Sequence, residues 1–278
     1  MRRTSIAVCT VALTATLGGC ALGQAPAGSG DSGAGESGTA QQGGAYSDLA
    51  SLVSGASQTM SENNSYKLSI NATVGGSGGI QSDCDVDAAK SSMSCTGTTG
   101  EIIMTPEHTY MNNPQLNSLG GDPAKPWARI AKDSPAAAVG GAQTAALSEA
   151  SDFRKLLPEG SQFTQAGPDT VDGKQATRYE VVTDLNQVIA SAEGLAKQSY
   201  EILLQGGVTE IKQTVWADEQ GRPLKVEQIT PPMNVMGKQL GESATTLTYS
   251  DWGKPVDVAE PDASQVRDFE MPGLQPPG

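Results

Sequence analysis

The residue whose chemistry is easiest to specify from the sequence is Cys20. It closes the tetrapeptide Leu17-Gly18-Gly19-Cys20, which follows a basic start, Met1-Arg2-Arg3, and an apolar stretch without acidic residues over 6–17. That stretch is too short to cross a membrane as a helix but has the length of a signal-peptide core. The sequence therefore predicts a lipoprotein signal peptide over residues 1–19, cleavage before Cys20, and a diacylglyceryl group in thioether linkage to the Cys20 sulfur.

Lipidation would hold the rest of the chain on the outer face of the cell membrane. The amine that cleavage exposes is usually acylated as well, for example by palmitate, and two or more acyl chains anchor a protein at about 0.8 kcal/mol per buried methylene. Residues 21–45 are almost all Gly, Ala, Ser, Gln and Pro, so residues 20–45 are predicted to be the lipidated cysteine and a flexible linker. The alternative is a secreted protein in which a cysteine stands at the cleavage boundary by chance.

The other cysteines are expected to form a disulfide. The chain has 4 cysteines, of which Cys9 would leave with the signal peptide and Cys20 would be lipidated. Cys84 and Cys95 then remain in an oxidising compartment, where a bond between them would close a ring of about twelve residues and contribute about 3 kcal/mol. A metal site is the alternative, but it would need further ligands, and the only histidine is His108.

Two further patterns have a chemical interpretation and a simpler one. Residues 75–79, Gly-Gly-Ser-Gly-Gly, match the Gly-x-Ser-x-Gly nucleophile motif, which requires a strand before it and a helix after it. A second strand is predicted here instead, so we expect a hairpin turn. His108 is expected to be a solvated residue at another hairpin.

Asp83, Asp85 and Asp87 alternate along a strand, and they lack the glycine and distal glutamate of a calcium loop. We expect no enzyme activity, no cofactor and no metal.

Composition restricts the partners of the chain. The formal net charge is −13 over 278 residues, and loss of Arg2 and Arg3 with the signal peptide would make it more negative. A strongly acidic protein is a poor ligand for nucleic acid and for an anionic lipid surface. Aromatic residues make up only 4%, which is low for a carbohydrate-binding surface. No stretch after Cys20 has transmembrane length.

The periodicity of apolar residues predicts an α+β fold with one large antiparallel sheet. Leu49, Leu52, Val53, Ala56 and Met60 fall at helical spacing, and the pair Asn63-Asn64 should end that helix. A second helix is predicted from Leu185 to Leu203, the Ala-rich segment 133–158 suggests a broken helix, and the tail from Gly253 is predicted to be coil. Strands are expected around residues 66–74, 80–86, 92–98, 101–105, 109–112, 127–130, 162–169, 176–183, 208–217, 223–230 and 242–252.

Several hairpin motifs resemble those of the actinobacterial LppX/LprAFG-type lipoproteins. They are Val171-Asp172-Gly173-Lys174 with Tyr179, Val215-Trp216-Ala217-Asp218 with Gly221-Arg222-Pro223, the run 248–256, and Lys125-Pro126-Trp127. The resemblance covers most of residues 46–262. It implies the curved half-barrel sheet of LolA, with a hydrophobic cavity under helices that binds acyl chains of lipids or lipoglycans. The Cys84–Cys95 pair and the Ala-rich segment 133–150 depart from it.

Residues that would line such a cavity are those whose alternation or helical face points inward. The candidates are Val53, Leu68, Ile70, Ile102, Met104, Val188, Ile189, Leu195, Val215 and Val226. Each of them has ordinary core packing as its alternative role. A carrier built in this way needs no catalytic group, because it binds chains by apolar area, at about 25 cal/mol per Å² buried.

These observations favour a single domain over residues 46–278 that carries a lipid or lipoglycan. We expect a monomer with no nucleic-acid partner, held to the membrane by its anchor, with a membrane transporter as a possible partner class. The alternative is a sensor lipoprotein of the same fold, with a filled core, that binds a protein partner. An envelope hydrolase has little support, since no base is apparent for a nucleophile.

Overall fold

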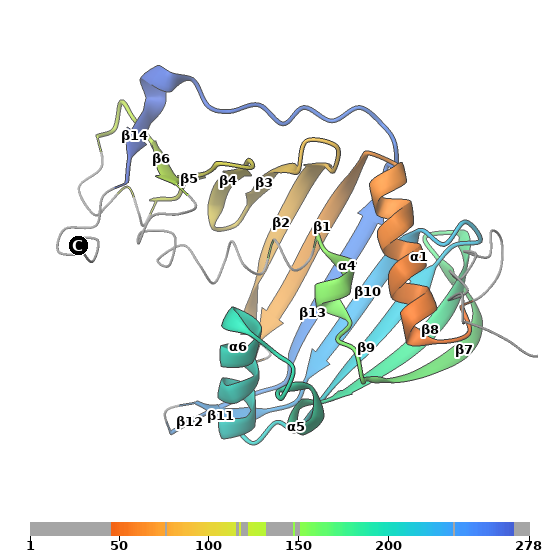
Figure 1. The fold of residues 1–278 in the computed structure, drawn as a ribbon. Helices are drawn as coiled ribbons and strands as arrows, with labels where there is room; N and C mark the ends of the chain where they lie inside the picture. The colour runs from red at the N-terminus through yellow and green to blue at the C-terminus, as the bar shows by residue number, and fades with distance from the viewer. Residues whose placement is uncertain are drawn as a thin grey trace, which may run out of the picture. The chain divides into compact units, whose positions relative to one another are not determined.

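The computed structural model describes residues 46–75, 77–114, 117, 122–131, 147, 151–235 and 237–269 (Figure 1). These residues belong to one compact unit, which spans Ala40–Gly278. The predicted signal peptide, Cys20 and the linker lie outside the described residues, as does most of the Ala-rich segment 133–150. The described elements are α1 (Leu49–Glu62), β1 (Ser65–Val74), β2 (Ser77–Asp87), β3 (Ser92–Gly97), β4 (Gly100–Met104), β5 (His108–Asn112), β6 (Trp127–Ala131), α4 (Phe153–Leu156), β7 (Gln162–Val171), β8 (Lys174–Asp184), α5 (Leu185–Val188), α6 (Gly194–Gln205), β9 (Glu210–Ala217), β10 (Pro223–Thr230), β11 (Met233–Val235), β12 (Lys238–Leu240), β13 (Ser243–Ser250), a 3-10 helix (Ala263–Gln265) and β14 (Val266–Asp268).

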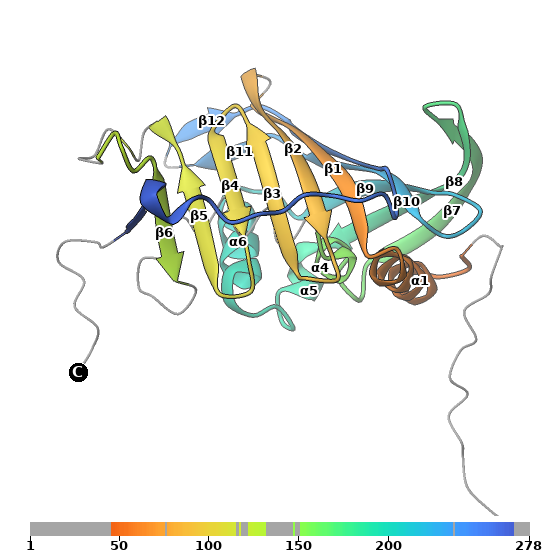
Figure 2. The same cartoon turned by 90° about the horizontal axis from the view of Figure 1, so that it is seen from above.

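The main sheet is an open half-barrel of 12 strands in the order β14-β6-β5-β4-β3-β2-β1-β13-β10-β9-β8-β7. Neighbouring strands run antiparallel, except that β14 lies parallel to β6. Helices α1, α4, α5 and α6 lie on one side of this sheet, as the view from above shows (Figure 2). We call that side the helix-covered face. The predicted α+β class with one large, mostly antiparallel sheet is confirmed.

Helix α1 begins and ends as the sequence predicts. The Asp48 carboxylate accepts a hydrogen bond from the Ser51 amide at 2.8 Å, and the Ser51 hydroxyl accepts one from the Asp48 amide, which forms a capping box. The helix stops at Asn63, and Asn64 then takes φ of +58°, a left-handed conformation that asparagine tolerates. Leu52, Ala56 and Met60 form the buried stripe of this helix.

The predicted hairpins form, and their turns explain their sequence motifs. Asp172 and Gly173 both have positive φ, which is the geometry of a two-residue turn that matches the twist of β7 and β8. Strand β2 starts at Ser77, the serine of the Gly-x-Ser-x-Gly motif, and continues to Asp87, where a nucleophile elbow would need a helix. Cys84 lies opposite Cys95 on β2 and β3, and the two form the predicted disulfide.

The helix predicted over 185–203 is broken into α5 and α6, so that part of the prediction is wrong. Asp184 caps α5, which ends after one turn, and the Ser191 hydroxyl then donates to the Val188 carbonyl at 3.1 Å. Such a side-chain bond competes with the helical backbone bond, and Gly194 is a weak helix former. A short hairpin of β11 and β12, which the sequence analysis did not predict, follows Pro231-Pro232.

The C-terminal tail was expected to be coil, but it ends in a strand of the main sheet. The Gly253 amide donates to the Ser65 carbonyl at 2.8 Å, and the chain then passes along the ends of strands β1 to β5 before β14 pairs with β6 (Figures 1 and 2). We call residues 253–265 the C-terminal strap. At its far end Phe269 packs against the main core, and its amide donates to the Arg129 carbonyl. The strap therefore fixes β6, which is otherwise an edge strand.

Candidate functional site on the helix-covered face

The helix-covered face is built from side chains that the strand register aligns in rows. The inner row contains Tyr249, Leu68, Cys84, Cys95, Ile102 and Met111, each opposite the next on a neighbouring strand. The middle row contains Val215, Val226, Leu247, Ile70 and Ser82. The outer row contains Gln213, Gln228, Thr245, Ala72 and Ile80. Alternate residues of a strand share a face, so every member of these rows points toward the helices.

Burial decreases from the inner row to the outer row. The whole inner row is buried, whereas the middle row changes from buried at Val215 and Leu247 to half-buried at Ile70. In the outer row Ile80 leaves 42% of its side chain exposed. The apolar face therefore continues from the closed core to solvent along β1 and β2.

The covered part of this face is filled by the chain itself. Leu52, Ala56 and Met60 of α1, together with Leu147, Phe153 and Leu157, are buried in the same hydrophobic cluster as the inner row. The segment around α4 is also held by polar contacts. The Tyr66 hydroxyl donates to the Ser151 carbonyl at 3.4 Å, and the Ser161 and Thr183 hydroxyls lie 2.8 Å apart. Residues 151–161 thus cover the face and are fastened to β1 and β8.

The predicted cavity residues divide between the main cluster and other places. Leu68, Ile102, Val215 and Val226 are buried in the main cluster, and Val53, Ile70 and Met104 pack against it while partly exposed. Val188 belongs to a separate cluster with Leu185, Val208 and Ile211, and Ile189 is half-buried outside both clusters. Leu195 lies in α6, and its side chain is outside the described part of the structure. Their role as a ligand-binding wall stays a prediction.

A polar side chain that the sequence analysis missed lies between the two apolar clusters. Gln213 follows Ile211 and precedes Val215 in the buried phase of β9, and only 4% of it is exposed. Its Nε2 donates to the Leu156 carbonyl at 2.7 Å and to Gln228 Oε1 at 3.1 Å. A polar residue in the apolar phase of an alternating strand was the signal that could have identified it.

An aromatic group closes the end of the face where the strap begins. The ring centroids of Tyr66 and Trp252 lie 4.8 Å apart, and those of Tyr249 and Trp252 lie 6.0 Å apart. Burial raises the pKa of the Tyr66 and Tyr249 hydroxyls above the ordinary tyrosine value, so both stay neutral at physiological pH.

The acidic strand face is only partly solvated, since Asp83 is exposed, Asp85 half-buried and Asp87 buried. Lys67 Nζ lies 3.0 Å from Asp85, and Lys90 Nζ lies 2.9 Å from Asp87, on the side of β2 opposite Cys84. The side-chain hydrogen bond from Lys90 lowers the pKa of Asp87. Among the described residues, no group of three or more His, Cys, Asp or Glu side chains could hold a metal ion. His108 begins β5 at a hairpin, with its ring centroid 5.9 Å from that of Tyr110.

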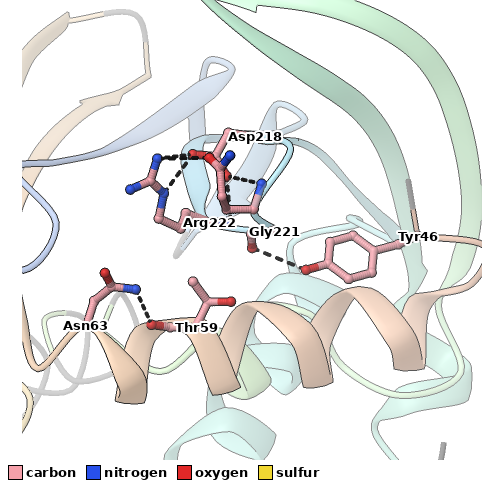
Figure 3. A network of polar contacts seen from close by, with 7 residues as sticks. Tyr46, Thr59, Asn63, Asp218, Gly221 and Arg222 are labelled. Carbon is pink, nitrogen blue, oxygen red and sulfur yellow. Dashed lines mark hydrogen bonds and ion pairs between the residues drawn. The ribbon is translucent and has the colours of Figure 1, made fainter. Parts of the chain in front are cut away.

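The first described residue, Tyr46, connects α1 to the β9–β10 turn (Figure 3). Its hydroxyl donates to the Gly221 carbonyl at 3.2 Å, and its amide donates to the Tyr179 hydroxyl at 2.9 Å. The turn is stabilised by Asp218, whose carboxylate accepts from the Arg222 amide at 2.9 Å and from Arg222 Nε at 2.7 Å. Tyr46 thus ties the start of α1 to the sheet that the helix covers.

This chain aligns with several solved structures at low sequence identity. Lipoprotein LppX of Mycobacterium tuberculosis aligns with a TM-score of 0.41 and 16% identity, over 76% of this chain and 100% of LppX. LprF of Mycobacterium bovis aligns with a TM-score of 0.40 and 14% identity, over 76% of this chain and 95% of LprF. A chain of the MucA/MucB complex of Pseudomonas aeruginosa aligns with a TM-score of 0.34 and 13% identity, over 74% of this chain and 58% of its own length. LppX and LprF are members of the group that the hairpin motifs resemble.

No protein-family model and no curated protein sequence matches the chain. Likenesses of this size carry no information about the site, whose chemistry must be argued from its own residues. Within the described part of the chain, none of the helices combines the length and apolar character needed to cross a membrane.

Proposed function

We propose that this chain is a membrane-anchored lipoprotein that binds acyl chains of a lipid or lipoglycan on its helix-covered face, at the outer face of the cell membrane. The observation that carries the proposal is the decrease in burial along the middle and outer rows. Val226 and Leu247 lie in the closed core, Ile70 is half-buried, and Ile80 is exposed. A chain laid along β1 and β2 would extend the core outward without leaving an apolar surface in water.

The binding energy in this proposal comes from area rather than from specific contacts. Apolar surface removed from water contributes about 25 cal/mol per Å², so a long acyl chain is bound well by an apolar strip even without polar partners. The disulfide between Cys84 and Cys95 lies in the inner row, and it joins β2 of this strip to the neighbouring strand β3.

Deeper binding would require residues 151–161 to move. Phe153 and Leu157 occupy the core positions that a longer ligand would take. Hydrogen bonds from Tyr66 to Ser151, from Gln213 to Leu156 and between Ser161 and Thr183 fasten the segment and would have to break. Movement of this segment and of α1 exchanges the chain's own apolar side chains for those of a ligand. Lipidation of Cys20 keeps the domain near the lipids it would load, and a membrane transporter is a proposed partner class.

The test is native mass spectrometry of residues 46–278 produced in a bacterium that makes the natural lipids, followed by solvent extraction. We expect added mass that is released as lipid. Ile80→Asp should reduce lipid occupancy about tenfold, because burial of an isoleucine side chain contributes about 1.5–3 kcal/mol. Ile229→Asp is the matched control, since Ile229 is similarly exposed at 36% but lies on the other face of β10. Lipid-free protein that takes up no mass from a membrane extract would contradict the proposal.

A second candidate function is the binding of a protein partner by a domain whose core is filled. The burial of Phe153 and Leu157 against the inner row favours it, as does Ile202 of α6, which is 53% exposed. The mass measurement separates the two functions, because a sensor of this kind would remain free of lipid. Ile202→Asp would then weaken capture of the partner while Ile80→Asp would not.

A further inference from the structure

Gln213 carries a buried acceptor that the described residues leave without a hydrogen bond. Only 4% of the residue is exposed, and its Oε1 has no hydrogen-bond partner among the described residues. Buried polar atoms are almost always hydrogen-bonded, so each exception in a folded protein needs a physical explanation. The free energy lost by leaving such an atom unpaired makes this position a candidate recognition point.

The orientation of the Gln213 amide follows from its neighbours. A backbone carbonyl can only accept, so the amide atom 2.7 Å from the Leu156 carbonyl must be Nε2. The second Nε2 proton is directed to Gln228 Oε1. Both donors of Gln213 are therefore committed, and only its acceptor is left over.

The neighbouring hydroxyl groups on the same face are also committed. The Ser161 hydroxyl donates to the Pro158 carbonyl at 2.8 Å, so the Thr183 hydroxyl, 2.8 Å from it, supplies the proton that they share. Thr183 lies on β8, the strand that pairs with β9. Val181, two residues earlier on the same face of β8, lies directly opposite Gln213. The Thr183 proton is not available to Gln213 Oε1.

The acceptor stands at the buried end of the outer row. From Gln213 the row passes through Gln228, Thr245 and Ala72, all half-buried, to the exposed Ile80. The apolar middle row runs beside it. Val215 and Val226 of that row are buried, so a ligand reaches this end of the face only when residues 151–161 move aside. Its chains would then follow the middle row and place a group attached to them along the outer row, near Gln213.

We propose that Gln213 Oε1 accepts a hydrogen bond from a free hydroxyl group of the bound lipid, so that the chain selects hydroxyl-bearing lipids over fully esterified ones. This inference rests on the proposed lipid-binding function. A neutral hydroxyl fits better than an ammonium group, because the buried Ile211 and Val215 flank Gln213 on the same face of β9 and an unpaired buried charge is costly. The hydroxyl supplies the donor that none of the described residues provides at this point.

The first experiment needs no variant. Residues 46–278, stripped of lipid, are titrated with 1,2-dioleoylglycerol and with its 3-acetyl ester, which has the same chains and no free hydroxyl, and binding is followed by displacement of a fluorescent fatty acid. We expect the alcohol to bind about tenfold more tightly, the effect of one hydrogen bond to a buried acceptor. Equal binding of the two lipids would overturn the assignment, and an isolated ordered water at Gln213 would give that result.

A variant then assigns the preference to the residue. Gln213→Met removes the acceptor at similar volume, so the variant should bind the alcohol and its acetyl ester about equally tightly. Thr214→Val is the control, because Thr214 is on the same strand but on the opposite face and should keep the preference. A preference that persists in Gln213→Met overturns the proposal, and thermal melting shows whether that variant is folded. If the wild type binds neither lipid nor the fluorescent fatty acid, the proposed function itself fails, which differs from binding both lipids equally.

Discussion

The hydroxyl of Tyr46 and the carbonyl of Gly221 form a 3.2 Å hydrogen bond that joins the start of the folded unit to the β9–β10 turn (Figure 3). The Tyr46 ring also occupies the space that side chains at two glycines would need. A Cβ at Gly55 of α1 would lie 2.5 Å from the Tyr46 ring, and a Cβ at Gly221 would overlap the Tyr46 hydroxyl. The position of α1 over the sheet therefore depends on these two glycines.

Gly221→Ala should destabilise the protein more than an alanine at an equally strained glycine elsewhere. Gly221 and Gly173 both have φ of +77°, but a Cβ at Gly173 would meet nothing within 4 Å. Left-handed backbone costs an alanine about 1–2 kcal/mol, and that cost is shared by both variants. The overlap with Tyr46 should add about 1–3 kcal/mol for Gly221→Ala alone, measured by urea unfolding. Equal losses would show that Tyr46 is free to move aside.

Stability should fall at alkaline pH partly because of Tyr46. Burial, then the charges of Tyr179 and Asp218, raise the pKa of Tyr46 to about 12. A group whose pKa is higher in the folded state stabilises the fold below its unfolded pKa, near 10, and this contribution is lost as the pH rises toward 12. Tyr46→Phe should therefore show a shallower decrease in unfolding free energy between these pH values than the wild type. An unchanged slope would show that Tyr46 ionises without cost.

The disulfide should contribute a substantial part of the stability of the sheet. Cys84 and Cys95 are 11 residues apart in the chain and both are buried, so neither sulfur should react with a thiol reagent in the native protein. Replacement of both by alanine should lower the free energy of unfolding by about 2–5 kcal/mol, measured by denaturant unfolding. Quantitative thiol labelling of both cysteines without reductant or denaturant would contradict the bond.

Cys20→Ala should release the protein from the membrane without unfolding the domain. Cys20 lies outside the compact unit that contains the described residues, so its replacement should leave the melting temperature unchanged. Membrane fractionation of cells that express the full chain gives the readout, and residues 46–278 provide the released control. Full membrane retention of the variant would contradict the predicted lipid anchor at Cys20.

Local patterns predicted a large part of the fold. Alternation in β1, β8, β9 and β10 and the apolar stripe of α1 are set by residues close together in the chain, because a side chain's direction repeats every two residues in a strand and about every 3.6 in a helix. The motif Val171-Asp172-Gly173-Lys174 predicted its own hairpin for a similar reason, since glycine and aspartate tolerate the positive φ that the turn requires. The break between α5 and α6 was missed because one apolar face continues across it.

By itself, the sequence determined helix α1, most of the strands and their hairpin neighbours, the Cys84–Cys95 pair and the prediction of an anchor at Cys20. The tertiary structure decided which distant segments meet: β14 with β6, Tyr46 with Gly221, and residues 151–161 with the inner row. It also decided that Gln213 is buried and that its acceptor has no partner in the described part of the chain. The physical reason is that periodicity fixes the direction of a side chain from its immediate neighbours, whereas burial and hydrogen-bond pairing depend on residues far away in the chain that only folding brings together.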